Sequence, residues 1–407
     1  MTSGADVAVT GLGLVTPAGC DATRTWAGVL DGRPTAALDP ELEGNSVRLS
    51  CRVSGFDADA LLGARRALRL DPFVRFTLVA AHEAVADAGL DPADWDGARV
   101  GVVLGCADGG PGTVETQHRT LLDEGAQRVS PLLLPMQLPN MLAGQTAIEF
   151  GATGPNLVVA TACASGATAI GTARDLLLLH RCDVVLAGGG EAMITPLVMA
   201  GFARMGALSH REGDPATASR PFDAGRDGFV AAEGASVLVL ERTSDARARS
   251  ARIRARVVGY GASADAHHMT SPHPTGAGSE AAVRAALADA GAGTGDVGHV
   301  NAHGTSTPLN DLAEGRMIGR LFTDGPVVTS TKGVTGHMLG AAGAVEAALT
   351  VLALEKGVVP PTANLSTLDP ELDIEVATVP TACPDGLALS NSFGFGGQNA
   401  VLALARA

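Results

Sequence analysis

Short apolar runs alternate along the chain with segments of helical periodicity. The runs occupy residues 7–14, 100–104, 157–160, 183–187, 236–240, 299–302 and 327–329. Most of them contain few polar positions, which is typical of strands that are covered on both faces. Residues 77–89 are typical of the intervening segments, with apolar residues at helical spacing and a glycine at the end. The pattern predicts an α/β fold.

A charged stretch at residues 241–254 divides this pattern into a longer and a shorter part. We therefore expect an N-terminal half at residues 1–250 and a C-terminal half at residues 251–407. Each part has a strand, a tight turn and a helix of small residues, at 158–167 and at 327–336. The similarity between the two segments is faint, so chance explains it as readily as duplication does.

Composition places the chain among ordered globular proteins. With 407 residues it is long enough for one large layered unit or two fused domains. Apolar residues make up 46% and charged residues 18%, a balance that excludes disorder. The 52 glycines and 3% aromatics predict a core of small aliphatic side chains with close helix–sheet packing.

The net charge of −14 argues against nucleic acid and anionic lipid surfaces as partners. No apolar run reaches the length of about 18 residues that a membrane span needs, and no signal segment opens the chain. The six cysteines have no C-x-x-C spacing, which argues against zinc or a disulfide framework. These features predict a cytoplasmic enzyme with reduced thiols.

Cys163 lies where a reactive thiol is expected. An apolar run after Pro155 leads directly to it, and a helix of small residues is predicted at 164–173. Unpaired N–H groups and the positive end of a helix dipole favour the thiolate. Such a site lowers a cysteine pKa from about 8.5 by about one unit or more. The alternative is a buried structural cysteine that packs as a small hydrophobe.

Two histidines also follow predicted strands. His303 lies in the turn after residues 299–302, and His337 follows residues 327–329 with Lys332 five positions before it. Loops at strand ends are where α/β sheets bind ligands, so we expect Cys163 and both histidines to share one site. A loop at 389–399 with three close glycines is either an oxyanion-binding loop or a plain turn.

These motifs resemble those of the β-ketoacyl-acyl-carrier-protein synthases, in the elongating, decarboxylating branch of the thiolase-like superfamily. The matching segments are Thr161-Ala-Cys-Ala-Ser-Gly166, Arg220-Pro-Phe-Asp-Ala-Gly-Arg-Asp-Gly-Phe229, Asp265-Ala-His-His-Met-Thr270, Asn301-Ala-His-Gly-Thr-Ser-Thr307, Lys332 with Gly336-His337, and 391–397. They span essentially the whole chain in family order. Thiolases would need a second catalytic cysteine, and chain-initiating synthases an asparagine in place of one histidine. The resemblance implies a five-layer αβαβα fold whose two similar halves are related by a pseudo-twofold axis.

The resemblance also implies the catalytic roles. Cys163 would attack an acyl thioester and carry the acyl group, with the amides of Cys163 and Phe395 as oxyanion donors. Neutral His303 and His337 would donate hydrogen bonds to the enolate formed when malonyl-carrier loses carbon dioxide, and His303 would also assist that loss. Attack of the carbanion on acyl-Cys163 gives a β-ketoacyl product two carbons longer. Two further residues would orient His337 and its loop: Lys332 and Glu346.

Binding residues are implied in the same way. Thr305 and Thr307 match the hydroxyls that hold the phosphopantetheine arm, and the motif favours this role over ordinary turn capping. The arm belongs to the carrier protein, and the chemistry requires no metal or other cofactor. Three residues would line the acyl pocket, with the last of them also acting as a gate: Cys106, Phe202 and Phe395. Burial in the core is an equally good interpretation of Phe202.

The expected partners are proteins. An acidic acyl carrier protein would dock on a local basic rim of five residues: Arg65, Arg66, Arg69, Arg128 and Arg204. A solvated helix face explains the arginines equally well. No carrier attachment site occurs in the chain, so the carrier is a separate protein. The apolar segment at 130–142 implies a dimer, either with a second copy or with a homologous chain-length factor.

Two departures from the family pattern leave the acyl substrate open. Gln398 replaces a threonine common in fatty-acid synthases, and Cys106-Ala-Asp replaces a more usual small-residue loop. A type II polyketide ketosynthase is thus as plausible as a fatty-acid enzyme, although Gly304-Thr-Ser-Thr-Pro308 is closer to the fatty-acid type. Two alternatives of other classes are a catalytically silent partner subunit and an acyltransferase that does not decarboxylate.

Overall fold

A computed structural model describes residues 6–407, and its largest element is a ten-stranded sheet. The strand order is β10-β9-β13-β14-β8-β1-β7-β6-β4-β5. The strands are β1 (Val7–Val15), β4 (Val100–Gly105), β5 (Asn156–Val159), β6 (Val184–Glu191), β7 (Gly234–Arg242), β8 (Ala255–Ala264), β9 (Val297–Asn301), β10 (Val327–Thr329), β13 (Leu387–Gly394) and β14 (Gln398–Arg406). Two small ribbons pair β2 (Ala37–Leu38) with β3 (Leu49–Ser50) and β11 (Val358–Val359) with β12 (Thr381–Ala382).

The sheet consists of two halves with the same topology. Residues 7–9 of β1 pair with residues 255–257 of β8, and this short antiparallel contact is the junction. From the junction outwards, two antiparallel and then two parallel pairings join the strands of the first half, in the order β1, β7, β6, β4 and β5. The strands β8, β14, β13, β9 and β10 repeat that sequence of pairings. The two similar halves predicted from the family resemblance are therefore confirmed.

The faint sequence similarity between residues 158–167 and 327–336 also has a structural counterpart. β5 and β10 are each the third strand of their half in chain order and the outermost in the sheet. Each leads towards a helix that lies between the two halves of the sheet, α8 (Ser165–Leu178) after β5 and α14 (Ala342–Lys356) after β10. The equivalence of these positions favours duplication over chance.

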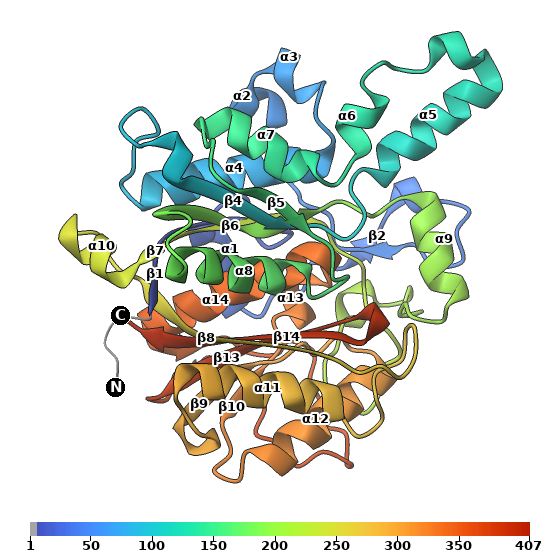
Figure 1. The fold of residues 1–407 in the computed structure, drawn as a ribbon. Helices are drawn as coiled ribbons and strands as arrows, with labels where there is room; N and C mark the ends of the chain where they lie inside the picture. The colour runs from blue at the N-terminus through green and yellow to red at the C-terminus, as the bar shows by residue number, and fades with distance from the viewer. Residues whose placement is uncertain (1–5) are drawn as a thin grey trace.

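Figure 1 shows five layers. The outer helices are α4 (Pro72–Asp87) and α7 (Met141–Phe150) on one side, and α11 (Ala277–Ala290) and α12 (Pro308–Leu321) on the other. Between the two halves of the sheet lie α8 and α14, and α14 is buried at every residue from Ala342 to Leu354. Small side chains allow this packing: a Cβ on Gly166 would lie 2.5 Å from the backbone nitrogen of Ala344.

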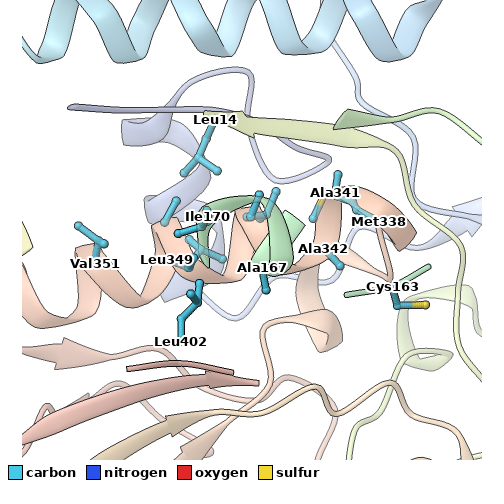
Figure 2. Close-up of a cluster of buried hydrophobic side chains, with 14 of the residues drawn as sticks. Leu14, Cys163, Ala167, Ile170, Met338, Ala341, Ala342, Leu349, Val351 and Leu402 are labelled. Carbon is cyan, nitrogen blue, oxygen red and sulfur yellow. The ribbon is translucent and has the colours of Figure 1, made fainter. Parts of the chain in front are cut away.

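The central core leads directly to Cys163. Figure 2 shows Ala167 and Ile170 of α8 packed beside Leu349 of α14. Cys163 lies at one end of this cluster, and its sulfur is directed away from it. The tight packing of the two helices therefore fixes where the thiol is presented.

The remaining helices are short or lie outside the five layers, except for the buried α13. They include α1 (Ala22–Leu30), α2 (Ala58–Leu62), α3 (Ala64–Ala67), α5 (Pro111–Glu124), α6 (Leu133–Gln137), α9 (Pro196–Arg204), α10 (Thr243–Ala248) and α13 (Lys332–Thr335). Within residues 6–407, no helix combines the length and apolar character needed to cross a bilayer.

All seven strands predicted from apolar runs are present. The ten-stranded sheet has three more, β8, β13 and β14, of which β8 and β13 gave no strand signal in the sequence. β8 follows the charged stretch that forms α10, and β13 carries the polar residues 390–392, so neither has a continuous apolar run. One prediction is wrong in detail. The strand before Cys163 was expected to be buried, but Leu157 of β5 is 43% exposed, because β5 is an edge strand of the sheet.

Candidate active site

Cys163 lies in a tight turn between β5 and α8. Ala162 has a φ of +49°, a left-handed conformation that is costly for a residue with a Cβ. The Ser165 hydroxyl holds the turn: its oxygen accepts from the Thr161 N–H at 2.9 Å, and it donates to the Ala162 carbonyl at 2.6 Å. The small residues around Cys163 allow this conformation, which directs the thiol into a cavity.

The turn and two histidine loops converge on one point. The Cys163 Sγ and one ring nitrogen each of His303 and His337 lie within 4.8 Å of one another. The two imidazole centroids are 5.3 Å apart, and the rings are nearly perpendicular at 82°. Cys163 follows β5, His303 follows β9 and His337 follows β10 through α13. The sequence-based expectation that these three residues share one site therefore agrees with the structure.

Both imidazoles are buried and neutral. Burial is the main cause that lowers the pKa of His303 and of His337 well below the ordinary value, and the nearby Lys332 charge lowers both further. The Leu339 N–H donates to Nδ1 of His337 at 3.3 Å, and Lys332 Nζ lies 3.5 Å from Nδ1 of His303. Since Nδ1 accepts in each ring, the ring proton is assigned to Nε2. The site therefore has two neutral N–H donors.

This tautomer bears on metal binding, because a cysteine with two histidines resembles a set of zinc ligands. A metal-bound histidine normally donates its other ring N–H to an acceptor. Here the second nitrogen of both rings faces a donor instead, Lys332 for His303 and the Leu339 amide for His337. The surroundings of the two rings therefore fit hydrogen-bond donation better than metal ligation.

Lys332 and Glu346 form a buried ion pair behind the histidines. Their side chains are 1% and 3% exposed. Lys332 Nζ donates to Glu346 Oε1 and also to the His303 carbonyl at 2.6 Å. Burial raises the pKa of Glu346 to about 7, and the Lys332 ammonium opposes that rise. The pair thus fixes the His303 backbone, and the Lys332 charge adds to the effect of burial that keeps both imidazoles neutral.

Replacing Lys332 with methionine is expected to destabilise the fold by about 3–5 kcal/mol at about pH 8, because it leaves a buried carboxylate unpaired. Lys332 lowers the pKa of Glu346, so in the variant this pKa should rise above about 7, and the loss should shrink as the pH falls from about 8 to about 6 and the buried carboxylate takes up a proton. Urea unfolding at about pH 6 and about pH 8 measures both effects.

The matched control for this prediction is the double variant Lys332→Met with Glu346→Gln, which removes both charges. It should recover most of the lost stability in a double-mutant cycle. A single variant as stable as the original protein at both pH values would contradict the assigned ion pair.

The expected direction of the Cys163 pKa is wrong. Burial raises the pKa of the Cys163 thiol to about 11, while the Lys332 charge and a hydrogen bond from the Phe395 amide lower it. The thiol is buried, and the resulting desolvation outweighs the favourable charges. The resting side chain is therefore a thiol.

The loop at 394–397 brings the Phe395 amide to Cys163. A Cβ on Gly394 would lie 2.5 Å from the Thr161 carbonyl oxygen, so only glycine allows the loop to approach the nucleophile turn this closely. The loop is held on its other side by the N–H of Asp265, which donates to the Gly397 carbonyl at 2.8 Å. This geometry fits an oxyanion-binding loop rather than a plain turn.

The three reactive residues lie in a cavity of about 400 Å³. Four of the residues expected to bind substrate also line it: Phe202, Thr305, Thr307 and Phe395. The Thr305 and Thr307 hydroxyl oxygens are 2.9 Å apart. Phe229 links the apolar part of the cavity to the histidines, with ring centroids 5.4 Å from both Phe202 and His337.

Comparison with known proteins matches this architecture. The N-terminal domain model of the β-ketoacyl synthase family matches residues 5–246, and its C-terminal domain model matches residues 254–366. The chain belongs to the β-ketoacyl synthase family. It is therefore an enzyme of the acyltransferase class.

Several β-ketoacyl synthases resemble it over nearly their full length. A 3-oxoacyl-(acyl-carrier-protein) synthase 2 from Staphylococcus aureus (strain N315) is 43% identical, covering 99% of this chain and 98% of the relative. The protein of the same name from Synechocystis sp. is 44% identical, covering 98% and 97%. Among solved structures, the ishigamide ketosynthase/chain length factor is 31% identical with a TM-score of 0.92, covering 100% of both chains. A β-ketoacyl synthase from Burkholderia phymatum is 32% identical with a TM-score of 0.91, covering 99% of both.

The structure corrects one expected pocket residue of this β-ketoacyl synthase. Cys106 does not line the catalytic cavity, and its neighbour Ala107 does. The Cys106 thiol is fully buried and donates to Glu191 at 3.5 Å. Glu191 also accepts from the Ala107 N–H, and burial raises its pKa to about 8. This buried carboxyl draws the thiol away from the cavity.

The five arginines do not form one rim on a single β-ketoacyl synthase chain. Arg66 pairs with Glu149, and Arg128 pairs with Glu124 at 3.2 Å. Arg65 and Arg69 are exposed in and after α3, which Figure 1 shows well apart from α9. Arg204 is exposed at the end of α9 and directly precedes Met205, which lines the cavity. Of the five arginines, Arg204 is therefore the one that lies next to a cavity-lining residue in the chain.

Sequence reasoning missed Glu314. Its carboxylate accepts from the N–H groups of His303 and Gly304, each at 2.8 Å, and from Asn391 at 3.1 Å. It therefore fixes the His303 turn and ties it to β13. Glu314 lies in an ordinary stretch of α12, and nothing in its sequence context distinguishes it from a surface glutamate.

Proposed function

We propose that Cys163, His303 and His337 catalyse decarboxylative condensation of an acyl group with malonyl-carrier protein. The observation that supports this most directly is the cluster itself. A thiol and two neutral imidazoles, each with an N–H on Nε2, lie within 4.8 Å in a buried cavity. An acyl acceptor next to two donors of this kind suits a reaction that transfers an acyl group and forms an enolate.

In the first step, Cys163 Sγ attacks the carbonyl carbon of an acyl thioester. The backbone N–H groups of Cys163 and Phe395 hold the negative oxygen of the tetrahedral intermediate. The carrier thiol leaves with the proton that the Cys163 thiol gives up, and the acyl group remains on sulfur. Because the pKa of Cys163 is raised, the thiol loses its proton during the attack and not in an equilibrium before it.

In the second step, the malonyl group loses carbon dioxide, and the electron pair of the broken C–C bond forms an enolate. His303 and His337 donate hydrogen bonds from Nε2 to its oxygen, and His303 also assists the departure of carbon dioxide. The carbanion then attacks the acyl carbon on Cys163, and the thiolate leaves. Lys332 and Glu346 are positioning residues, because Lys332 donates to the His303 carbonyl and Glu346 in turn accepts from Lys332.

The partners follow from the chemistry and from the relatives. Thr305 and Thr307 would bind the phosphopantetheine arm that a separate acyl carrier protein supplies, and this arm is the only cofactor that we assign. One solved relative, 31% identical with a TM-score of 0.87, is a type II PKS ketosynthase in complex with its acyl-carrier protein. The ishigamide structure is described as a ketosynthase/chain length factor, so we propose a dimer with a second copy or with such a partner.

We also propose that the functional halves divide between residues 250 and 251, and that the enzyme works in the cytoplasm.

Elongation of fatty-acid-type chains is the pathway that we favour. The 3-oxoacyl-(acyl-carrier-protein) synthase 2 relatives are 43–44% identical, against 31% for the polyketide ketosynthases. A polyketide role is the second candidate, motivated by Gln398 and the Cys106-Ala-Asp loop. A silent partner subunit would lack the nucleophile that this chain has.

Incubation with acyl-carrier and malonyl-carrier tests the assignment. We expect carbon dioxide release matched by a β-ketoacyl-carrier two carbons longer, detected by mass spectrometry. Transfer of the acyl group without carbon dioxide release would instead identify an acyltransferase that does not decarboxylate.

Charge reversal at Arg204 should weaken carrier docking without affecting chemistry. We expect Arg204→Glu to raise the KM for the acidic carrier about fivefold while kcat is unchanged, because an exposed charge at the rim mainly affects association. Arg33→Glu is the matched control, since Arg33 is exposed on a loop that does not line the cavity. Equal effects of the two substitutions would argue against docking at Arg204.

A further inference from the structure

Glu191 is a fully buried carboxyl that the proposed catalytic steps do not use. It is the last residue of β6, and 0% of it is exposed. Its Oε2 accepts from the Ala107 N–H at 2.6 Å, and its Oε1 lies 3.5 Å from the Cys106 sulfur. Burial raises the pKa of Glu191 to about 8, and no basic side chain is among the main groups that affect this pKa. Near neutral pH the side chain is therefore mostly the uncharged acid.

The Glu191 carboxyl packs against the turn that follows His337. This turn is the 3-10 element η6 (Leu339–Ala341), with Gly340 at its centre. A Cβ on Gly340 would overlap Glu191 Oε2 and would lie 2.5 Å from the Ala107 nitrogen. The Gly340 backbone therefore lies directly against the hydrogen-bonded pair of Glu191 and Ala107, and that pair fixes how close η6 comes to β6.

The same turn orients the His337 ring. The Leu339 N–H donates to Nδ1 of His337 at 3.3 Å, which leaves the ring proton on Nε2. Leu339 has a φ of +48°, a left-handed conformation that persists only where the surrounding structure holds it. The His337 backbone is held separately, because its N–H donates to the Val230 carbonyl and its carbonyl accepts from the Ala232 N–H. A shift of η6 would therefore act on the His337 side chain and leave its backbone in place.

The charge of Glu191 also reaches the catalytic cluster. Glu191 is one of the groups that raise the pKa of the Cys163 thiol. An ionised Glu191 would place a buried negative charge near the oxygen that becomes negative in the enolate. Like charges in a buried site repel strongly, so ionisation of Glu191 would oppose decarboxylation.

No neighbouring group would neutralise that charge. The two titratable side chains that face Glu191 from the loop after β4 are Cys106 and Asp108, and both are acids. The turn η6 and the first residues of α8 carry no titratable side chain. The acids next to β7 and α4 have partners of their own: Glu233 pairs with Arg52 at 3.4 Å, and Asp71 accepts from the Thr113 hydroxyl at 2.5 Å.

We propose that Glu191 is a positioning residue for His337, which it orients by holding the Leu339 turn through Gly340. This inference rests on the proposed function and adds to it a residue that touches neither the substrate nor the reacting atoms. The step that Glu191 serves is decarboxylation, because acylation of Cys163 uses backbone amides to hold its oxyanion. Loss of Glu191 should therefore slow decarboxylation and spare acylation.

The two half-reactions of the full-length protein separate this role from a merely structural one. We expect Glu191→Ala to slow malonyl-carrier decarboxylation roughly tenfold, because a small displacement of a catalytic group has effects of at least this size. Acylation of Cys163, followed by intact-protein mass spectrometry, should change less than about twofold. Glu191→Gln keeps an acceptor for the Ala107 N–H, so it should restore at least about half of the original decarboxylation rate at about pH 7.

The pH profile of decarboxylation gives a second readout, with Cys163→Ala as the background that isolates this step. We expect the rate to fall on the order of fivefold between about pH 7 and about pH 9.5 as Glu191 ionises, with less than about twofold of that fall by about pH 8. Adding Glu191→Gln should remove the fall, because an amide does not ionise. Glu233→Gln is the matched control: Glu233 is also a buried acid with a raised pKa, but it pairs with Arg52, so the fall should remain.

The inference fails if Glu191→Ala leaves decarboxylation unchanged or slows both half-reactions equally. It also fails if the alkaline fall is absent, survives in Glu191→Gln or disappears in Glu233→Gln. Gly340→Ala tests the same contact from the other side and decides the matter if the Glu191 variants do not fold. Its methyl group should displace η6, slow decarboxylation and spare acylation, and an equal loss of both would count against the role of Glu191. An original enzyme that forms no β-ketoacyl product at any pH would overturn the proposed function itself.

Discussion

Cys163→Ala is expected to lower the rate of condensation on the order of 10⁴-fold or more, because no other side chain in the cluster can carry the acyl group. The variant should show no acyl adduct by mass spectrometry. It should still release some carbon dioxide from malonyl-carrier, because the donors His303 and His337 remain. Loss of condensation with retained decarboxylation would separate the acyl-carrying step from the enolate-forming step.

Cys20→Ala provides the matched control. Cys20 is the one partly exposed cysteine among the described residues and does not line the catalytic cavity, so its replacement should leave condensation unchanged. Persistence of a covalent acyl adduct in Cys163→Ala would mean that a different residue is the nucleophile.

Removal of either imidazole is expected to have the second-largest effect. His303→Ala and His337→Ala should each slow condensation by about 10²–10⁴-fold, the range for loss of a general acid–base group or an oxyanion donor. Acylation of Cys163 should survive in both variants, because the amides of Cys163 and Phe395 hold the first oxyanion. Single-turnover acylation and malonyl-carrier decarboxylation, measured separately, distinguish the two steps.

His180→Asn is the control for these variants. His180 is exposed, does not line the cavity and has a φ of +55°, which asparagine tolerates. It should leave both steps unchanged. If His337→Ala abolished acylation as completely as condensation, His337 would act in the first step and the proposed division of roles would be wrong.

The sequence predicted the position of the cluster because the signal is local. Cys163 and His303 follow an apolar run within a few residues and His337 follows one after a short helix, and the topology of an α/β sheet brings such strand ends together. The five layers and the equivalent halves followed from the family resemblance and not from periodicity. β8 and β13 were not predicted, because charged or polar residues interrupt the apolar runs in their sequences.

Other features depend on packing between residues far apart in the chain. Glu314 contacts Asn391 across 77 positions, and Cys106 contacts Glu191 across 85. The direction of the Cys163 pKa likewise depends on how completely the surrounding loops exclude water, which a helix N-terminus in the sequence does not reveal.

The central claim is that two neutral imidazoles hold the enolate, and the pH dependence of malonyl-carrier decarboxylation tests it most directly. Cys163→Ala is the protein to use, since it isolates this step from acylation. An ordinary histidine titrates near 6.5, whereas burial lowers the pKa of His303 and His337 well below that value. We predict a rate that changes less than about twofold between about pH 6 and about pH 8. A steep fall with an apparent pKa near 6.5 would show that these rings become charged in that range, and would contradict the account.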